Sequence, residues 1–191
     1  MKLNSSFTKF NILAGTTLLL IAAVAIGVTI WKTKTPPSAS FPAIDTSQLT
    51  PAQQKIVLIL KQEFDTQPGG TKYSQGVTEP WCADFASWVY KEANVPFKNP
   101  NSGSWRIPGV YTLQEYLQSV GKVRLANSGY TPKVGDLMLY DNPSPFGQHT
   151  NIVLKNDNGV ITTIGGNEPG GIRVFVHTDP DNAGFIGYGV L

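Results

Sequence analysis

An uncharged apolar stretch near the start of the sequence most limits what this chain can fold into. No charged residue occurs from Phe10 to Trp31. As a helix that rises about 1.5 Å per residue, the part from Ile12 to Ile30 would span about 28 Å, close to the roughly 30 Å hydrocarbon core of a bilayer. We therefore expect a single transmembrane helix over residues 10–31, which leaves the rest of the chain to form the folded domain.

The residues around this stretch set the expected boundaries. A short tail over residues 1–9 precedes the helix, a linker over residues 32–44 follows it, and a folded domain is expected over residues 45–191. A cleavable signal peptide is the alternative, but its apolar part is usually about 7–15 residues long and ends in an A-x-A-like site, which Ser38-Ala39-Ser40 matches poorly. We expect the N-terminus inside the cell and the domain on the extracytoplasmic side of the cell membrane.

The net charge of +2 comes from the N-terminal segment. The first 44 residues carry four lysines and no acidic residue, and subtracting this +4 from the total leaves −2 for the domain. Nucleic-acid-binding domains usually show a basic face, so we expect no nucleic acid as a partner. The single cysteine excludes an internal disulfide and a cysteine-rich zinc cluster, and the two histidines and the carboxylates show no metal-ligand spacing. We expect no metal and no cofactor.

Apolar residues at helical spacing precede β-rich runs within the domain. Thr50-Pro51 predicts the start of a helix that continues to about Phe64, and two more helices are expected over residues 83–93 and about 111–120. Short β-rich runs separated by turns then predict an antiparallel meander over residues 137–140, 149–155, 160–164, 172–176 and 185–190. Helices followed by strands predict an α+β domain with the helices packed on one face of the sheet.

Cys82, the only thiol, lies where the second predicted helix begins. The unpaired N–H groups and the positive end of the helix dipole stabilise a thiolate at this position. Phe85, Ala86 and Val89 lie on the same helical face, so the sulfur is expected to point toward the sheet. Cys82 is therefore a candidate nucleophile, with an inert core cysteine as the alternative.

A nucleophilic cysteine needs a base, and His149 is the better candidate of the two histidines. It opens a predicted strand, and the turn over residues 156–159 predicts a hairpin that returns the chain past it. A two-residue loop places His149 opposite Gly166 and a three-residue loop places it opposite Asn167. Either register puts Asn167 beside His149, where its amide oxygen could accept the imidazole N–H and orient the ring; a simple turn residue is the alternative. His177 is expected to be an exposed residue beside a turn.

Four segments of the domain resemble the CHAP family, the cysteine- and histidine-dependent amidohydrolases and peptidases: EPWCADFASWV (79–89), GDLMLY (135–140), HTNIV (149–153) and Gly166-Asn167. The resemblance covers about residues 50–191. It implies a papain-like fold and hydrolysis of amide bonds in peptidoglycan, with Cys82 as nucleophile, His149 as base and Asn167 as orienting group. Many members carry a glutamate two positions before this asparagine, where the present chain has Gly165.

These observations predict a membrane-anchored peptidoglycan hydrolase that works through a thioester, as a stem-peptide or cross-bridge endopeptidase or as an N-acetylmuramoyl-L-alanine amidase. Its partners would be peptidoglycan and the membrane. The oxyanion would lie by the Cys82 N–H, with Tyr73 as a second donor. One alternative is a catalytically decayed, membrane-anchored wall-binding or envelope-assembly module, which Gly165 suggests. Another is an intracellular cysteine transferase of papain-like fold, which requires the anchor to face the other way.

Overall fold

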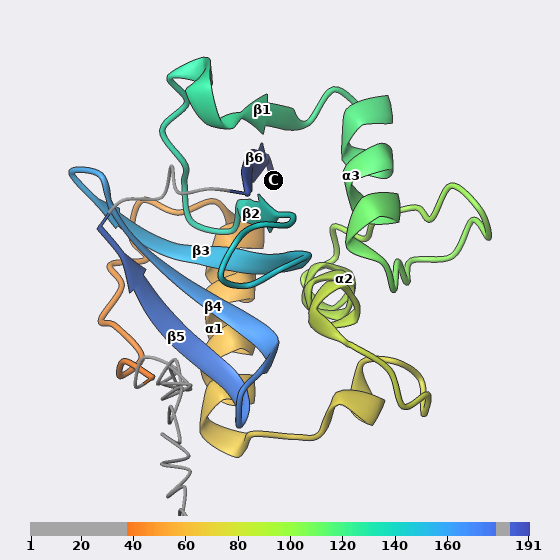
Figure 1. Cartoon of the computed structure of the whole chain (residues 1–191). Helices are drawn as coiled ribbons and strands as arrows, with labels where there is room; N and C mark the ends of the chain where they lie inside the picture. The colour runs from red at the N-terminus through yellow and green to blue at the C-terminus, as the bar shows by residue number, and fades with distance from the viewer. Residues whose placement is uncertain (1–37, 179–183) are drawn as a thin grey trace, which may run out of the picture. The chain divides into compact units, whose positions relative to one another are not determined.

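A computed structural model describes residues 38–178 and 184–191, which form an α+β domain of three α-helices and one antiparallel sheet (Figure 1). The predicted α+β class is confirmed. The helices are α1 (Pro51–Thr66), α2 (Cys82–Glu92) and α3 (Val110–Ser119). The strands are β1 (Val123–Leu125), β2 (Leu137–Tyr140), β3 (His149–Asp157), β4 (Val160–Glu168), β5 (Gly171–His177) and β6 (Phe185–Gly189).

Helix α1 begins where the sequence predicts. The Thr50 hydroxyl accepts the Gln53 N–H and the Gln53 side chain accepts the Thr50 N–H, which together form a capping box, while Pro51 occupies the first turn. The helix ends at Thr66, and the C-cap residue Gln67 that follows has a left-handed backbone with φ of 48°. Ile56 and Leu60, one turn apart, are fully buried against the rest of the domain.

The sheet has the strand order β1-β6-β2-β3-β4-β5, with every described pair antiparallel. Strands β2 to β5 form the predicted meander, but β6 returns to pair with β2 instead of extending it. The prediction of a meander throughout is therefore wrong for β6, and β1 was not predicted. Both differences depend on pairing between strands distant in sequence, which local patterns do not specify.

The hairpin of β3 and β4 sets the position of His149. Its turn contains two residues, since Asp157 pairs with Val160. A bulge farther along β3 then shifts the register by one residue, so that Ile152 pairs with Ile164. This is the register that the three-residue alternative predicts near His149, although the turn itself is shorter.

Two apolar clusters lie on opposite faces of the sheet. Leu137 and Leu139 belong to the larger cluster, which the three helices share, whereas Met138 and Tyr140 belong to the smaller one. Alternate residues of a strand point to opposite faces, so β2 is buried on both. In the larger cluster, α2 packs against β3 and β4, and α1 against β5.

The segment over residues 38–44 packs on the domain, before residue 45 where the sequence predicts that the domain begins. The Ala39 N–H donates to the Val174 carbonyl at 3.0 Å, and Phe41 contacts Phe64 with ring centroids 5.7 Å apart. The predicted transmembrane helix over 10–31 lies outside the described residues. Within 38–178 and 184–191, no helix has the length and apolar character needed to cross a bilayer.

Candidate active site

Cys82 is the first residue of α2, and its side chain is buried. The preceding residue, Trp81, makes no side-chain capping bond, so the first N–H groups of the helix are left to act on whatever lies at its N-terminus. The predicted position of the thiol at a helix start is confirmed.

Gly166 allows the start of α2 to approach strand β4. A Cβ atom at this position would overlap the Trp81 ring and lie 2.7 Å from the Cβ of Phe85. Trp81 and Phe85 flank Cys82 in sequence, so the missing side chain at Gly166 brings the thiol close to the end of the sheet that carries His149. Only glycine permits this close packing of helix against strand.

His149 opens β3, is 5% exposed, and joins the thiol to a carboxylate. Its Nε2 lies 2.7 Å from Glu168 Oε1, and the imidazole also hydrogen-bonds Cys82. Because Nε2 donates to the carboxylate, Nδ1 is the ring nitrogen left to face the thiol. Burial lowers the pKa of His149, but the hydrogen bonds and charges of Cys82 and Glu168 outweigh burial and raise it to about 10.

Asn167, the predicted orienting residue, is exposed and does not contact His149. Its backbone has a positive φ of 60°, at a point where the β4–β5 pairing shifts by one residue between Gly165 and Glu168. This bulge turns Asn167 outward and brings Glu168 to the imidazole. The structure therefore places Glu168, and not Asn167, in the orienting position.

Tyr73, the predicted second oxyanion donor, is a core residue. It is fully buried between Trp81 and Phe85, with ring centroids 5.3 and 5.0 Å away. Its hydroxyl donates to Glu63 Oε2 at 2.6 Å. Since a phenol has a single O–H, this bond leaves no donor for a substrate oxyanion, and the predicted role of Tyr73 is not supported by its position.

Arg106 forms ion pairs with carboxylates on both sides of Cys82. Its Nε donates to Asp84 Oδ1 at 2.7 Å, and its guanidinium also pairs with Glu79. Burial raises the pKa of the fully buried Asp84 carboxyl, and the guanidinium opposes that rise. The arginine thus links residues on both sides of Cys82 to the loop between α2 and α3, which no sequence motif indicated.

His177 is buried, so the prediction that it is exposed is wrong. It is 8% exposed, and its Nε2 lies 2.9 Å from the Thr163 hydroxyl. Phe146 lies between the two histidines, with its ring centroid 5.8 Å from His149 and 5.9 Å from His177. The β5 pairing places His177 opposite Ile161, inside the sheet and not in the turn that follows.

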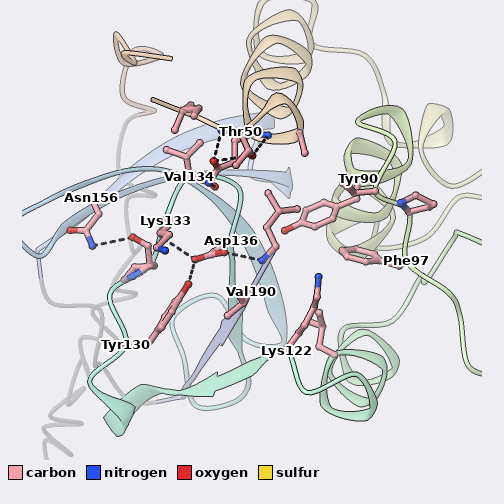
Figure 2. Close-up of a pocket in the computed structure, with 18 of the residues that line it drawn as sticks. Thr50, Tyr90, Phe97, Lys122, Tyr130, Lys133, Val134, Asp136, Asn156 and Val190 are labelled. Atoms are coloured by element: carbon pink, nitrogen blue, oxygen red, sulfur yellow. Dashed lines mark hydrogen bonds between the residues drawn. The ribbon is translucent and has the colours of Figure 1, made fainter. Parts of the chain in front are cut away.

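A hollow of about 980 Å³ lies apart from these residues, toward the other end of α2. Figure 2 shows Tyr90, Phe97 and Lys122 around it, and neither Cys82 nor His149 lines it. At its floor Asp136 accepts hydrogen bonds from Tyr130, Lys133 and Leu191 at 2.8–2.9 Å. The Gly135-Asp136 motif therefore has a structural role, because it ties β2 to the neighbouring chain segments.

No three His, Cys, Asp or Glu side chains of the described ranges form a group that could hold a metal ion. The site instead consists of a thiol, an imidazole and a carboxylate. Such a set can deprotonate a nucleophile, stabilise the resulting imidazolium and return the proton to a leaving group.

Sequence reasoning missed two side chains of this site, Glu168 and Asn151. The carboxamide of Asn151 lies 2.8 Å from His149 Nε2 and is fully buried. A signal for Glu168 was present, because two successive glycines before an asparagine favour a bulge, and a bulge moves the next residue to the opposite face.

A model of the CHAP domain matches residues 72–167, which is half of the chain. This region contains Cys82 and His149 and ends one residue before Glu168. No curated protein and no solved structure is similar enough to the chain to count as a match. The matched region and the paired thiol and imidazole agree, and the chain belongs to the CHAP domain family.

Proposed function

We propose that this protein is a membrane-anchored peptidoglycan hydrolase that cleaves an amide bond through a thioester on Cys82. One observation carries the proposal: in a member of the CHAP family, the thiol at the start of α2 is hydrogen-bonded to an imidazole whose other nitrogen lies 2.7 Å from a buried carboxylate. Peptidoglycan is the substrate class that the family suggests, and both a peptidase and an amidase reaction use this chemistry.

The reaction begins with attack of the Cys82 thiolate on the substrate carbonyl, with the thiol proton held at His149 Nδ1. The developing oxyanion lies near the first N–H groups of α2, which have no side-chain cap. As the C–N bond breaks, the Nδ1 proton passes to the leaving amine and the acyl group remains on sulfur. Water then loses a proton to Nδ1, attacks the thioester and releases the acid and the thiolate.

Glu168 keeps the imidazole in the tautomer that this cycle needs. Its carboxylate accepts the Nε2–H throughout and stabilises the imidazolium that forms between the two proton transfers. The alternative of a decayed wall-binding module is motivated by Gly165 at the family's acidic position. Glu168 supports the enzyme instead, since it supplies a carboxylate to His149 from another position.

The experiment compares the wild-type protein with Cys82→Ala and His149→Ala on purified peptidoglycan, and His177→Gln serves as the matched histidine control. We expect fragment release by the wild type and the control, and none by the two site variants at unchanged circular dichroism. Mass spectrometry of the fragments separates the reactions: an endopeptidase creates a new amino terminus within the peptide, and an amidase frees the muramic acid from it. Fragment release by folded Cys82→Ala protein would contradict the proposal.

The membrane anchor over residues 10–31 and the extracytoplasmic location of the domain belong to the same proposal. The uncharged length of that stretch supports it. In untreated cells the protein is expected in the membrane fraction. Protease added to intact cells is expected to degrade its folded domain. Protection from protease would favour an intracellular cysteine transferase.

A further inference from the structure

The space beside Gly165 is already occupied by two other side chains. A Cβ atom built at Gly165 would overlap the carboxamide of Asn151 and lie 2.7 Å from Glu168 Oε1. Real Cβ atoms do not make such contacts. The φ of Gly165 is not in the left-handed region, so the position excludes a side chain because of its neighbours and not because of its backbone.

Asn151 is fully buried and faces both partners of the orienting pair. We orient its carboxamide with the nitrogen toward Glu168, because an amide oxygen there would face a carboxylate oxygen. The amide nitrogen then donates one hydrogen to Glu168 Oε1 at 3.1 Å and the other to the Thr150 carbonyl at 3.1 Å. It makes no hydrogen bond to His149 Nε2, 2.8 Å away, because Nε2 itself donates to Glu168. Two N–H groups, one from the imidazole and one from the amide, thus converge on a single carboxylate oxygen.

The bulge of β4 brings that oxygen to the two donors. Gly165 pairs with Arg173, whereas Glu168 pairs with Gly171, so the register moves by one residue between them. The Glu168 side chain therefore enters the region into which a side chain at 165 would project. A residue with a Cβ cannot occupy position 165 unless Asn151 or Glu168 moves from its present position.

We propose that Asn151 is a positioning residue for Glu168, and that Gly165 is its steric counterpart, so that the three positions form one matched set that orients His149. This inference rests on the proposed function for its catalytic meaning. Its structural content is a reciprocity: a side chain at 165 harms the site more while Asn151 is present, because the contact that remains without Asn151 is with Glu168 Oε1, the far end of a flexible side chain.

A double-mutant cycle tests the reciprocity with Asn151→Ala, Gly165→Ala and the double variant. The controls are Asn127→Ala, at an exposed asparagine, and Gly69→Ala, where an added Cβ meets no atom within 4 Å. The first readout is the pH dependence of Cys82 alkylation by iodoacetamide, which needs no substrate. The second is the rate of fragment release from peptidoglycan.

We expect Gly165→Ala alone to lower fragment release about tenfold or more, and to lower it by a smaller factor in the Asn151→Ala background, where only the contact with Glu168 Oε1 remains. Asn151→Ala is expected to move the alkaline limit of the alkylation profile to lower pH, because the carboxylate that stabilises the imidazolium is held less firmly. The controls should leave both readouts unchanged. An equal fold-loss from Gly165→Ala in both backgrounds, or an unshifted profile in Asn151→Ala, would overturn the inference.

Two further measurements keep the test decisive if a variant folds poorly. Asn151→Asp keeps the shape of the side chain but places a second carboxylate beside Glu168, and it is expected to distort the alkylation profile more than Asn151→Ala. If Gly165→Ala is unstable, the double variant is expected to recover its melting temperature. A wild-type protein that releases no fragments would contradict the proposed function alone, since the alkylation cycle is still measured.

Discussion

The two histidines of this chain share one neighbourhood and have opposite proton affinities. Both are nearly buried, and the ring of Phe146 lies between them. The pKa of His149 is raised to about 10, whereas the pKa of His177 is lowered from 6.5. Burial acts in the same direction on both, so burial alone does not decide which histidine can serve as a base.

Their hydrogen-bond partners account for the difference. His149 lies between a thiol and a carboxylate, both of which favour the imidazolium. Burial lowers the pKa of His177, and the charge of Glu168 opposes this without outweighing it, because the direct partner of the ring is the neutral Thr163 hydroxyl. The same carboxylate acts on both rings, but only His149 is hydrogen-bonded to it, and that direct bond makes His149 the proton carrier.

The largest effect is expected from removing the Glu168 carboxylate, whose hydrogen bond distinguishes His149 from His177. We expect Glu168→Gln to lower kcat/KM on peptidoglycan by about a hundredfold or more, because a neutral amide does not stabilise the imidazolium and can turn either its oxygen or its NH2 toward Nε2, so it no longer enforces one tautomer. The neighbouring Asn167→Ala is the matched control and should stay within about twofold of the wild type. The reverse result, a large loss of kcat/KM in Asn167→Ala and a small one in Glu168→Gln, would support Asn167 as the orienting residue, as the sequence predicts.

Direct titration measures the pKa of each histidine. By NMR of labelled histidine, His149 is expected to titrate near pH 10 and His177 below 6.5. The leaving amine needs a protonated Nδ1, so hydrolysis should fall as the pH rises through about 10. In Glu168→Gln the His149 titration and this alkaline limit should both move to lower pH. Coincident titration of the two rings would contradict the assignment of their partners.

Stability should depend on pH in opposite ways at the two sites. The folded pKa of His177 lies below its unfolded value, so its contribution to stability is present above about pH 6.5 and is lost as the pH falls. His177→Phe should therefore flatten the acid decline of the free energy of unfolding, whose slope is at most about 1.4 kcal/mol per pH unit for one proton. Urea melts between pH 5 and pH 8 measure this. An unchanged slope would show that His177 is not the group that titrates.

For His149 the sign is reversed. Its folded pKa is raised, so its contribution is fully present below about pH 6.5 and is lost as the pH rises through about 10. In the same melts, extended to alkaline pH, His149→Ala should lose the decline toward pH 10 and keep the acid decline that His177 causes.

The smallest effect is expected at Tyr73, a third buried ring whose partner is also a carboxylate. Burial and the hydrogen bond to Glu63 raise its pKa well above the usual range, so it stays neutral and only donates. Tyr73→Phe should destabilise the protein by about 1–3 kcal/mol, because a bond to a charged group is lost, and should leave hydrolysis unchanged. A fall in kcat without a change in stability would support the predicted role of Tyr73 as an oxyanion donor.

Local patterns predicted what local chemistry determines. The capping residues at Thr50 and Pro51, the start of a helix at Cys82 and the strand at His149 all follow from neighbouring residues, and the structure has them. The place of β6 beside β2 depends on distant pairing. Glu168, and not Asn167, contacts His149 because of a one-residue shift of register. Such a shift reverses the direction of the side chains that follow it, and a prediction that assumes strictly alternating side chains does not include it.

The segment over residues 38–44 has a consequence for handling the domain. Strand β5 is the last strand of the sheet, and its outer side receives the Ala39 N–H at its Val174 carbonyl and gives the Val174 N–H to Ser38 Oγ. Uncovered outer strands are templates for pairing with another molecule. A chain shortened to begin at residue 45, the boundary that composition suggests, would expose this strand and is expected to aggregate more readily, so the segment over residues 38–44 also protects the edge of the sheet.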